Sequence, residues 1–214
     1  MTTHGKLRLL ALRDQNDAAG EAMARQRERF TELAGRKAVR VVSAFNLFQT
    51  PEAIADLMVR TGAPRDGERW LEPSAGLGRL YRAIRYRSSA HVTLVEQARQ
   101  CAAELYRETQ GDSNATLLER DFLQCTAEQF GGLFDGILMN PPFKSATDIR
   151  HIRHALTLLR SGGRIVSLCY AGPRQRAAFE NRNEWKWTDL EPGSFRSEGT
   201  DAAVAMITRT NGAG

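Results

Sequence analysis

Short apolar runs alternate with amphipathic segments over most of this chain. Runs rich in branched apolar or aromatic residues favour buried strands, and we expect strands at 69–73, 91–96, within 115–123, at 134–140 and at 164–170. Apolar positions at helical spacing predict helices between them, at 78–87, 98–109 and 146–163, the last ending at Gly162 and Gly163. Strands separated by helices predict an α/β fold with a parallel sheet and right-handed crossovers.

The two ends of this pattern differ from its middle. Residues 48–64 predict a helix with Thr50 as its N-cap and Pro51 at its first position. The segment 193–209 holds two extended runs without a helix between them, so we expect an antiparallel hairpin that closes the sheet edge. Residues 6–36 read as a polar helix that could cap the core, bind a partner, self-associate or fray. We therefore expect a helical extension over 1–40 and one catalytic domain over 41–214.

The apolar run that ends at Met139 is followed by Asn140, two prolines and Phe143. Proline has no N–H for a sheet ladder, so the strand must end there on a stiff turn. The side chains after the break then lie at the carboxyl end of a strand, where open α/β sheets bind their ligands.

A glycine-containing loop follows the strand at 69–73. Gly76 and Gly78 allow a tight turn and a close approach of backbone to ligand. A dinucleotide fingerprint needs a third glycine at position 81, which is Tyr81, so a pyrophosphate site is disfavoured. Glu96 ends the next strand, and a carboxylate there can accept both hydroxyls of a ribose. The loop and Glu96 together suit a nucleoside cofactor.

Composition narrows the class of protein. The 214 residues are 42% hydrophobic, which suits one medium domain with a core, and no apolar run approaches the length of a membrane span. The N-terminus does not resemble a secretory signal, and the three scattered cysteines lack metal-binding spacing. We expect reduced thiols in a cytoplasmic protein without a metal or a membrane partner.

The positive charge is concentrated in two places. The net charge is +5, but residues 1–40 carry +4 and residues 141–186 carry +6, whereas the stretch between them carries −3. A polyanion lying across the turn at 140–143 would explain the second block, although basic residues on a solvated surface are the plainer reading. Two aromatic residues, Trp185 and Trp187, lie among these basic residues, and this combination favours a nucleic acid as the binding partner.

Taken together, these motifs resemble class I S-adenosylmethionine-dependent methyltransferases, and in particular the N6-adenine DNA methyltransferases of the NPPF type. The resemblance extends from Phe45 to about Arg209 and rests on FQTPEAIA, LEPSAGLG, VE, RDFL and NPPF in that order. It implies a Rossmann-like sheet of seven strands, mostly parallel with an antiparallel C-terminal hairpin and helices on both faces. It also implies S-adenosyl-L-methionine as the cofactor.

The resemblance assigns roles to individual residues. The implied catalytic residues are Asn140, Pro141, Pro142 and Phe143. The implied cofactor-binding residues are Phe45, Gln49, Thr50, Pro51, Glu72, Pro73, Ser74, Ala75, Gly76, Gly78, Glu96, Gln97, Asp121, Phe122 and Asn140. The residues expected to bind nucleic acid are Lys144, Arg150, Arg153, Arg174, Arg176, Arg182 and Lys186.

Plainer readings stay open for several of these residues. Thr50 could be only a helix cap, and Asp121 only a surface acid. Glu72 could bind amides of its own loop or balance the sulfonium charge. His151 and His154 are read as phosphate neighbours or surface residues.

The acceptor is expected to be an exocyclic amine, foremost N6 of adenine in DNA, because the turn can present two hydrogen-bond acceptors to a planar NH₂ group. Adenine or guanine in RNA, a protein glutamine, and a non-catalytic cofactor-binding subunit remain alternatives. The resembled enzymes usually carry a large C-terminal recognition domain; we expect sequence specificity here to come instead from the loop at 171–200, from the N-terminal helix or from a partner, or to be low.

Overall fold

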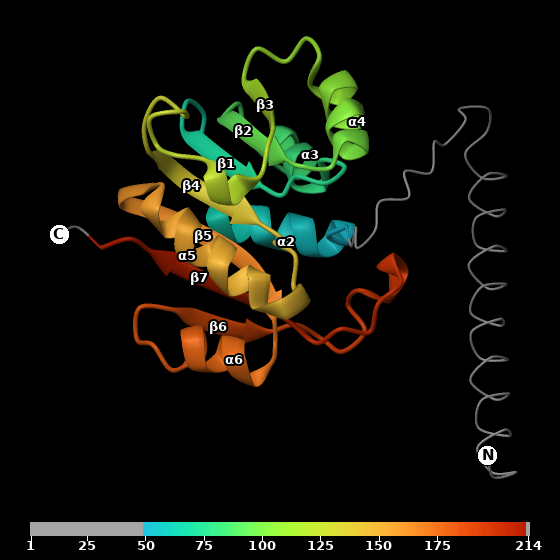
Figure 1. Cartoon of the computed structure of the whole chain (residues 1–214), viewed down its shortest axis with the longest axis vertical. Helices are drawn as coiled ribbons and strands as arrows, with labels where there is room; N and C mark the ends of the chain where they lie inside the picture. The colour runs from blue at the N-terminus through green and yellow to red at the C-terminus, as the bar shows by residue number, and fades with distance from the viewer. Residues whose placement is uncertain (1–48, 213–214) are drawn as a thin grey trace, which may run out of the picture. The chain divides into compact units, whose positions relative to one another are not determined.

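The computed structural model describes residues 49–212. The expected helix at 6–36, the cofactor-binding candidate Phe45 and the expected domain boundary after residue 40 lie outside these residues. The described elements form one seven-stranded sheet in the order β3-β2-β1-β4-β5-β7-β6 (Figure 1). The strands are β1 (Arg69–Pro73), β2 (His91–Glu96), β3 (Ala115–Glu119), β4 (Phe134–Met139), β5 (Leu159–Tyr170), β6 (Lys186–Asp189) and β7 (Val204–Thr210).

The direction of the strands confirms the expected fold class. The neighbours from β3 to β5 all pair in parallel, and β7 pairs antiparallel with both β5 and β6. The carboxyl ends of the five parallel strands therefore meet at one edge of the sheet. This is the arrangement of the Rossmann-like methyltransferase fold.

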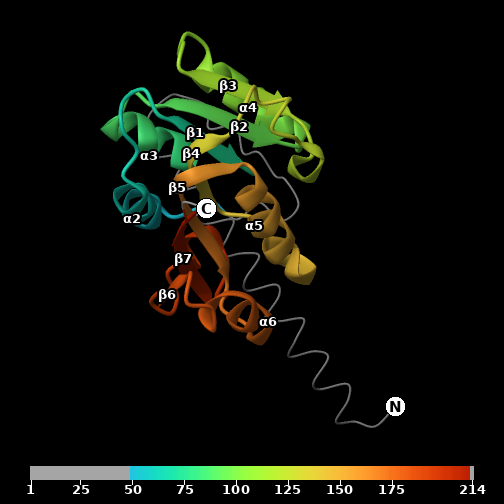
Figure 2. The ribbon, with the colours of Figure 1, turned by 90° about the vertical axis from the view of Figure 1, so that its left-hand side faces the viewer.

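Helices cover both faces of the sheet (Figure 2). One face packs against three helices, α2 (Glu52–Gly62), α3 (Arg79–Arg87) and α4 (Arg99–Thr109), through an apolar cluster that includes Met58, Ile84 and Leu105. The other face packs against α5 (Thr147–Thr157) and against the segment made of α6 (Pro173–Gln175) and a following helical turn at Arg176–Glu180. Both clusters contain fully buried strand residues, so the sheet lies between two apolar layers.

Helix α2 begins one residue later than the sequence predicted. Pro51 is the N-cap and Glu52 the first helical residue, so Thr50 does not cap the helix. The helix ends at Ala63, which lies in the left-handed region with φ 47° and donates its N–H to the carbonyl of Val59. The helix therefore ends within the predicted range of 48–64, and an alanine takes the strained position at its end.

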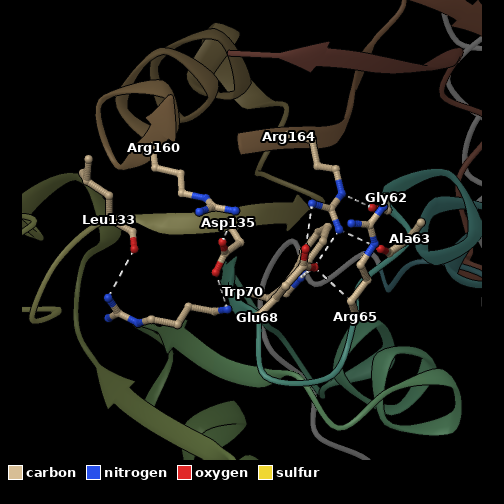
Figure 3. Close-up of polar contacts among 10 residues, drawn as sticks. Gly62, Ala63, Arg65, Glu68, Trp70, Leu133, Asp135, Arg160 and Arg164 are labelled. Carbon is tan, nitrogen blue, oxygen red and sulfur yellow. Dashed lines mark hydrogen bonds and ion pairs between the residues drawn. The ribbon is translucent and has the colours of Figure 1, made fainter. Parts of the chain in front are cut away.

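A polar network at the amino ends of the strands fastens α2 to the sheet (Figure 3). Arg164 of β5 donates to the carbonyls of Gly62 and Ala63, which are unpaired at the helix end, and it binds Glu68 through two nitrogens at 2.6 and 3.2 Å. Its guanidinium lies 4.8 Å from the ring centroid of Trp70, whose Nε1 also donates to Glu68. The network joins α2, β1 and β5 far from the carboxyl edge of the sheet.

Two predicted boundaries are wrong. The helix expected over 146–163 ends at Thr157, and Leu159 already pairs with Phe134 as the first residue of β5. The residues between Leu159 and Arg164 form an irregularity in β5, with Gly162 at φ 72°, so the two glycines shape a bulge instead of ending a helix.

The C-terminal hairpin also differs from its prediction. The partner of β7 is β6, at Lys186–Asp189, between the expected strand at 164–170 and the segment 193–209 that was expected to hold both runs of the hairpin. The first expected run, after residue 193, contains a short 3₁₀ turn at Arg196–Glu198. The hairpin does form the sheet edge, as expected, with a longer connection.

Candidate active site

A cavity of about 690 Å³ lies at the carboxyl ends of the parallel strands. It is lined by all four predicted catalytic residues, Asn140, Pro141, Pro142 and Phe143. It is also lined by ten further residues of the predicted cofactor set, namely Gln49, Thr50, Glu72, Ser74, Ala75, Gly76, Glu96, Gln97, Asp121 and Phe122. Segments that are 90 residues apart in the sequence thus meet at one cavity.

Among the predicted cofactor residues that fall within 49–212, three do not line the cavity: Pro51, Pro73 and Gly78. Gly78 begins α3 in the left-handed region with φ 76°, and a Cβ there would lie 2.8 Å from Cδ2 of Leu105. The physical need for glycine at this position is therefore the turn and the close packing of α3 against α4, and not an approach to a ligand.

Glu96 holds the glycine-containing loop in shape. Its Oε2 accepts the N–H of Gly76 at 2.8 Å, and its Oε1 accepts the N–H of Ala98 at 2.7 Å. The loop begins at Ser74, which has φ 82° although it is not glycine. Each carboxylate oxygen keeps a further lone pair, so Glu96 can fold the loop and still bind hydroxyl groups at the cavity wall.

Glu72 is a buried acid in the cavity wall with one carboxylate oxygen that has no hydrogen-bond partner. Its side chain is 2% exposed, and the oxygen in question is Oε2. Burial raises its pKa well above the ordinary value, and a hydrogen bond with the Tyr81 backbone and the nearby charge of Arg82 oppose that rise. A buried acceptor that faces a cavity suits a cationic ligand, and a sulfonium or ammonium group has that charge. Glu72 therefore suits the positively charged part of S-adenosylmethionine.

The turn after β4 is rigid and leads into strained backbone. Pro141 is buried, and Asn140 is half-buried at the cavity wall. Ser145 and Ala146 then adopt positive φ angles of 56° and 58°, before α5 begins. Non-glycine residues in this conformation cost free energy and concentrate at functional sites.

Asp121 and Phe122 stand where the chain leaves β3. Asp121 Oδ1 accepts the N–H of Leu123 at 3.0 Å, so this side chain caps a short helical turn and also lines the cavity. Phe122 is buried beside His151, with ring centroids 5.5 Å apart. The plain reading of Asp121 as a surface acid is incomplete, because the residue is half-buried at the cavity.

Several cavity residues were not predicted from the sequence. His151 was expected at the surface or beside phosphate, but it is 6% exposed and lines the cavity, 3.5 Å from the hydroxyl of Ser74. Burial lowers its pKa to about 4, so the ring is neutral at neutral pH. Its place four residues after Thr147, which also lines the cavity, is a helical spacing that could have identified it.

Arg79 is the second unpredicted residue with a clear chemical role. It lines the cavity with a side chain that is 22% exposed, and its Nε is buried without a partner. Its guanidinium lies 3.5 Å from Glu52, a side chain that is 87% exposed, so this ion pair is weak. Arg79 can therefore bind an anionic group inside the cavity.

The predicted nucleic-acid residues lie between the turn after β4 and the start of β6. Lys144 lines the cavity, whereas Arg150 and Arg153 lie further along α5. Arg176 binds Glu180 and Asp189 at 2.6 and 2.7 Å, so its charge is already compensated. The other six have exposed side chains without an ion-pair partner among residues 49–212: Lys144, Arg150, Arg153, Arg174, Arg182 and Lys186.

Two other chemistries find no support in the described part of the chain. Between residues 49 and 212, no group of three or more His, Cys, Asp and Glu side chains is arranged to hold a metal ion. No helix in that range combines the length and the apolar character needed to cross a membrane.

Solved structures with the same fold include several methyltransferases. A candidate RNA methyltransferase from Pyrococcus horikoshii aligns with a TM-score of 0.63 at 16% identity, over 89% of this chain and 100% of that protein. TrmN from Thermus thermophilus aligns with a TM-score of 0.59 at 19% identity, over 74% of this chain. This chain spans 48% of TrmN, about half of its length.

A dimethyladenosine transferase from Plasmodium falciparum aligns with a TM-score of 0.58 at 16% identity, over 77% of this chain and 62% of that protein. At these identities the likeness establishes the fold alone. A comparison with curated protein sequences finds no match.

The sequence itself carries the family assignment. Residues 50–180 match the Methyltransferase small domain family, and this range begins at the cavity residue Thr50 and includes the loop at 74–78 and the turn at 140–143. The match covers more than half of the chain. The protein therefore belongs to the Methyltransferase small domain family and is an S-adenosylmethionine-dependent methyltransferase.

Proposed function

We propose that this protein methylates an exocyclic amine of a nucleic-acid base, with N6 of adenine in DNA as the acceptor. One observation carries the proposal. The Asn-Pro-Pro-Phe turn lines the same cavity as Glu72, Glu96 and Asp121, which are the acids suited to the cofactor. The polar turn and the cofactor-binding acids thus belong to one site.

The cofactor is assigned to the side of the cavity formed by β1, β2 and β3. Glu96 would accept hydroxyls of the ribose, and Asp121 and Phe122 would contact the adenine. Glu72 and Arg79 would hold the ammonium and the carboxylate of the amino-acid part, because their charges are opposite to those groups. When bound, S-adenosylmethionine supplies a methyl group activated by the sulfonium charge.

Asn140 and Pro141 would orient the acceptor amine. The nitrogen lone pair of such an amine is delocalised into the ring and must become localised for attack. The side-chain oxygen of Asn140 and the carbonyl of Pro141 can accept the two N–H groups and favour that geometry. Both groups are held in advance by the proline turn, so little reorganisation is needed during the reaction. Asn140 is neutral and is not a strong base, so its effect is orientation and stabilisation of developing charge.

Phe143 would provide a flat face for the acceptor base, with a stacking contribution of about 1–3 kcal/mol by analogy with single-stranded nucleic acids. A base inside a duplex would have to be flipped out of the helix to reach the turn. The exposed basic side chains of Lys144, Arg150 and Arg174 would contact phosphates, so binding would weaken as the salt concentration rises.

RNA is the second candidate acceptor. Two of the proteins with the same fold carry names that refer to RNA or to dimethyladenosine. The same turn handles an amine of either polymer, since the planar NH₂ group is identical in both.

The test uses S-adenosylmethionine with a tritiated methyl group and four acceptors: duplex DNA, single-stranded DNA, total RNA and a protein extract. Digestion of the labelled polymer to nucleosides then identifies the modified base. We expect label in DNA as N6-methyladenosine in its deoxy form. Label confined to RNA would support the second candidate, and label confined to protein or absent from all four would refute a nucleic-acid acceptor.

A further inference from the structure

An exposed aromatic ring stands at the cavity beside the catalytic turn. Four large hydrophobic side chains are exposed within residues 49–212, and Tyr170 is the one among them that lines the cavity, with 42% of its surface exposed. Within the same range, its hydroxyl has no hydrogen-bond partner. An exposed aromatic ring in a cavity wall offers a flat apolar surface to a ligand in that cavity.

The position of Tyr170 is fixed from two directions. It is the last residue of β5, and its N–H donates to Oδ2 of Asp148 at 3.0 Å. Asp148 is fully buried and also accepts from Nε2 of Gln175, at 3.0 Å for each oxygen. The ring packs over Gly172, where a Cβ would lie 2.6 Å from Cε1 and 2.7 Å from Cδ1 of the ring. The backbone is therefore anchored by a buried carboxylate, and the ring rests on a residue that has no side chain.

The order of the strands separates Tyr170 from the cofactor residues. Glu96 ends β2, and Asp121 follows β3, so the acids suited to the nucleoside lie on one side of β1. The strand β4, with the catalytic turn at its end, lies on the other side of β1, and β5 lies beyond it. Adjacent strands are about 4.8 Å apart, so a ligand that occupies the ends of β1 to β3 leaves the ends of β4 and β5 to a second ligand.

We propose that Tyr170 forms, together with Phe143, the aromatic wall of the acceptor subsite, and that a planar base lies against its exposed face. The inference rests on the proposed function and adds a residue that determines acceptor binding. The flat face of an aromatic ring suits a nucleobase. Stacking requires a planar ligand but does not distinguish one base from another.

The experiment compares four variants with the wild type. Tyr170→Phe keeps the ring, and Tyr170→Ala removes it. Gly172→Ala leaves the ring in the protein but displaces it, because the new methyl group cannot share its space. Tyr86→Ala is the matched control, since Tyr86 is 87% exposed and does not line the cavity. The affinity for S-adenosylmethionine is measured by calorimetry, and KM and kcat are measured with single-stranded DNA, duplex DNA and total RNA.

We expect Tyr170→Ala to raise KM for the nucleic-acid acceptor by about 10- to 100-fold, in line with the loss of one stacked base. Gly172→Ala should raise it in the same direction, and Tyr170→Phe should stay close to the wild type. The cofactor affinity should be unchanged in all four variants. A KM for Tyr170→Ala within twofold of the wild type, or an equal loss of cofactor affinity, would overturn the inference while the proposed function stands. A wild type that methylates no nucleic acid would overturn both.

Discussion

Glu68 offers a direct test of how the polar network at the amino ends of the strands contributes to stability. Its Oε2 accepts from the N–H of Arg65 at 2.9 Å, from Nε1 of Trp70 at 3.0 Å and from Nη2 of Arg164 at 2.6 Å (Figure 3). Replacing Glu68 by Gln keeps the shape of the side chain but removes its charge and one acceptor. Arg164 would then remain beside Trp70 without its anionic partner.

The expected magnitude follows from the pKa of Glu68. Burial alone would raise this pKa, but the hydrogen bonds from Arg164, the Arg65 backbone and Trp70 outweigh burial and lower it from 4.5 to about 2. One pKa unit corresponds to about 1.4 kcal/mol, so the shift corresponds to about 3 kcal/mol at neutral pH. The side chain is 14% exposed, and solvent screening reduces the expected loss to about 2 kcal/mol.

The sign of the pH dependence is fixed by the direction of the shift. Because the folded pKa is depressed, the stabilisation is complete above pH 4.5 and is lost as the pH falls through 2. Urea unfolding of the wild type and of Glu68→Gln should therefore differ by about 2 kcal/mol at pH 7 and by less than half of that at pH 3. The exposed Glu191, changed to Gln, is the control and should shift stability by no more than about 0.5 kcal/mol. Equal stability at pH 7, or a difference that does not shrink at pH 3, would refute the reasoning.

Four further changes probe the site and the helix end. Asn140→Ala should lower kcat/KM by about 10²–10³-fold while calorimetry finds S-adenosylmethionine binding nearly intact, and preserved turnover would contradict the role of this side chain. Glu72→Gln should abolish a rise in cofactor affinity with pH: burial raises the pKa of Glu72 in the ligand-free protein, and a bound cation would favour its ionised form, so calorimetry in two buffers should find proton release on binding by the wild type and none by the variant. Arg79→Met should weaken S-adenosylmethionine binding by about tenfold but leave the binding of 5′-methylthioadenosine, which lacks the carboxylate, unchanged; equal losses for both ligands would count against this assignment. Ala63→Gly should stabilise the protein by about 0.5–1 kcal/mol in urea unfolding, because glycine adopts the left-handed conformation without strain, and a loss of stability would contradict this.

The main features of the fold were predictable because the local pattern of apolar and polar residues agrees with the elements that the sheet contains. Each buried parallel strand is an apolar run bounded by polar residues, so the alternation of strands and helices could be identified without a structure. The boundary at 157–164 was misjudged because a pair of glycines has the same sequence signal whether it ends a helix or forms a bulge. The strand at Lys186–Asp189 is short, polar and at the sheet edge, so it lacks the buried face that produces a pattern.

Some residues of the candidate site were likewise predictable from the sequence, and others were not. Asn140 directly follows β4 and Glu96 is the last residue of β2, so the rule for strand ends could place both. Arg79 and Tyr170 reach the cavity only because of how α3 and β5 are arranged around it, and neither carries a motif. Those positions depend on which strands are neighbours, which a single sequence does not specify.

The antiparallel course of β7 has a practical consequence for handling the protein. Val204 pairs with Tyr170 at the cavity edge of the sheet, whereas Thr210 pairs with Arg164 near the opposite edge. A fusion partner or surface attachment joined after residue 212 would therefore start on the side of the sheet remote from the cavity. Protein immobilised in this way should leave the cavity mouth open to a long polymer in single-molecule or surface-based assays.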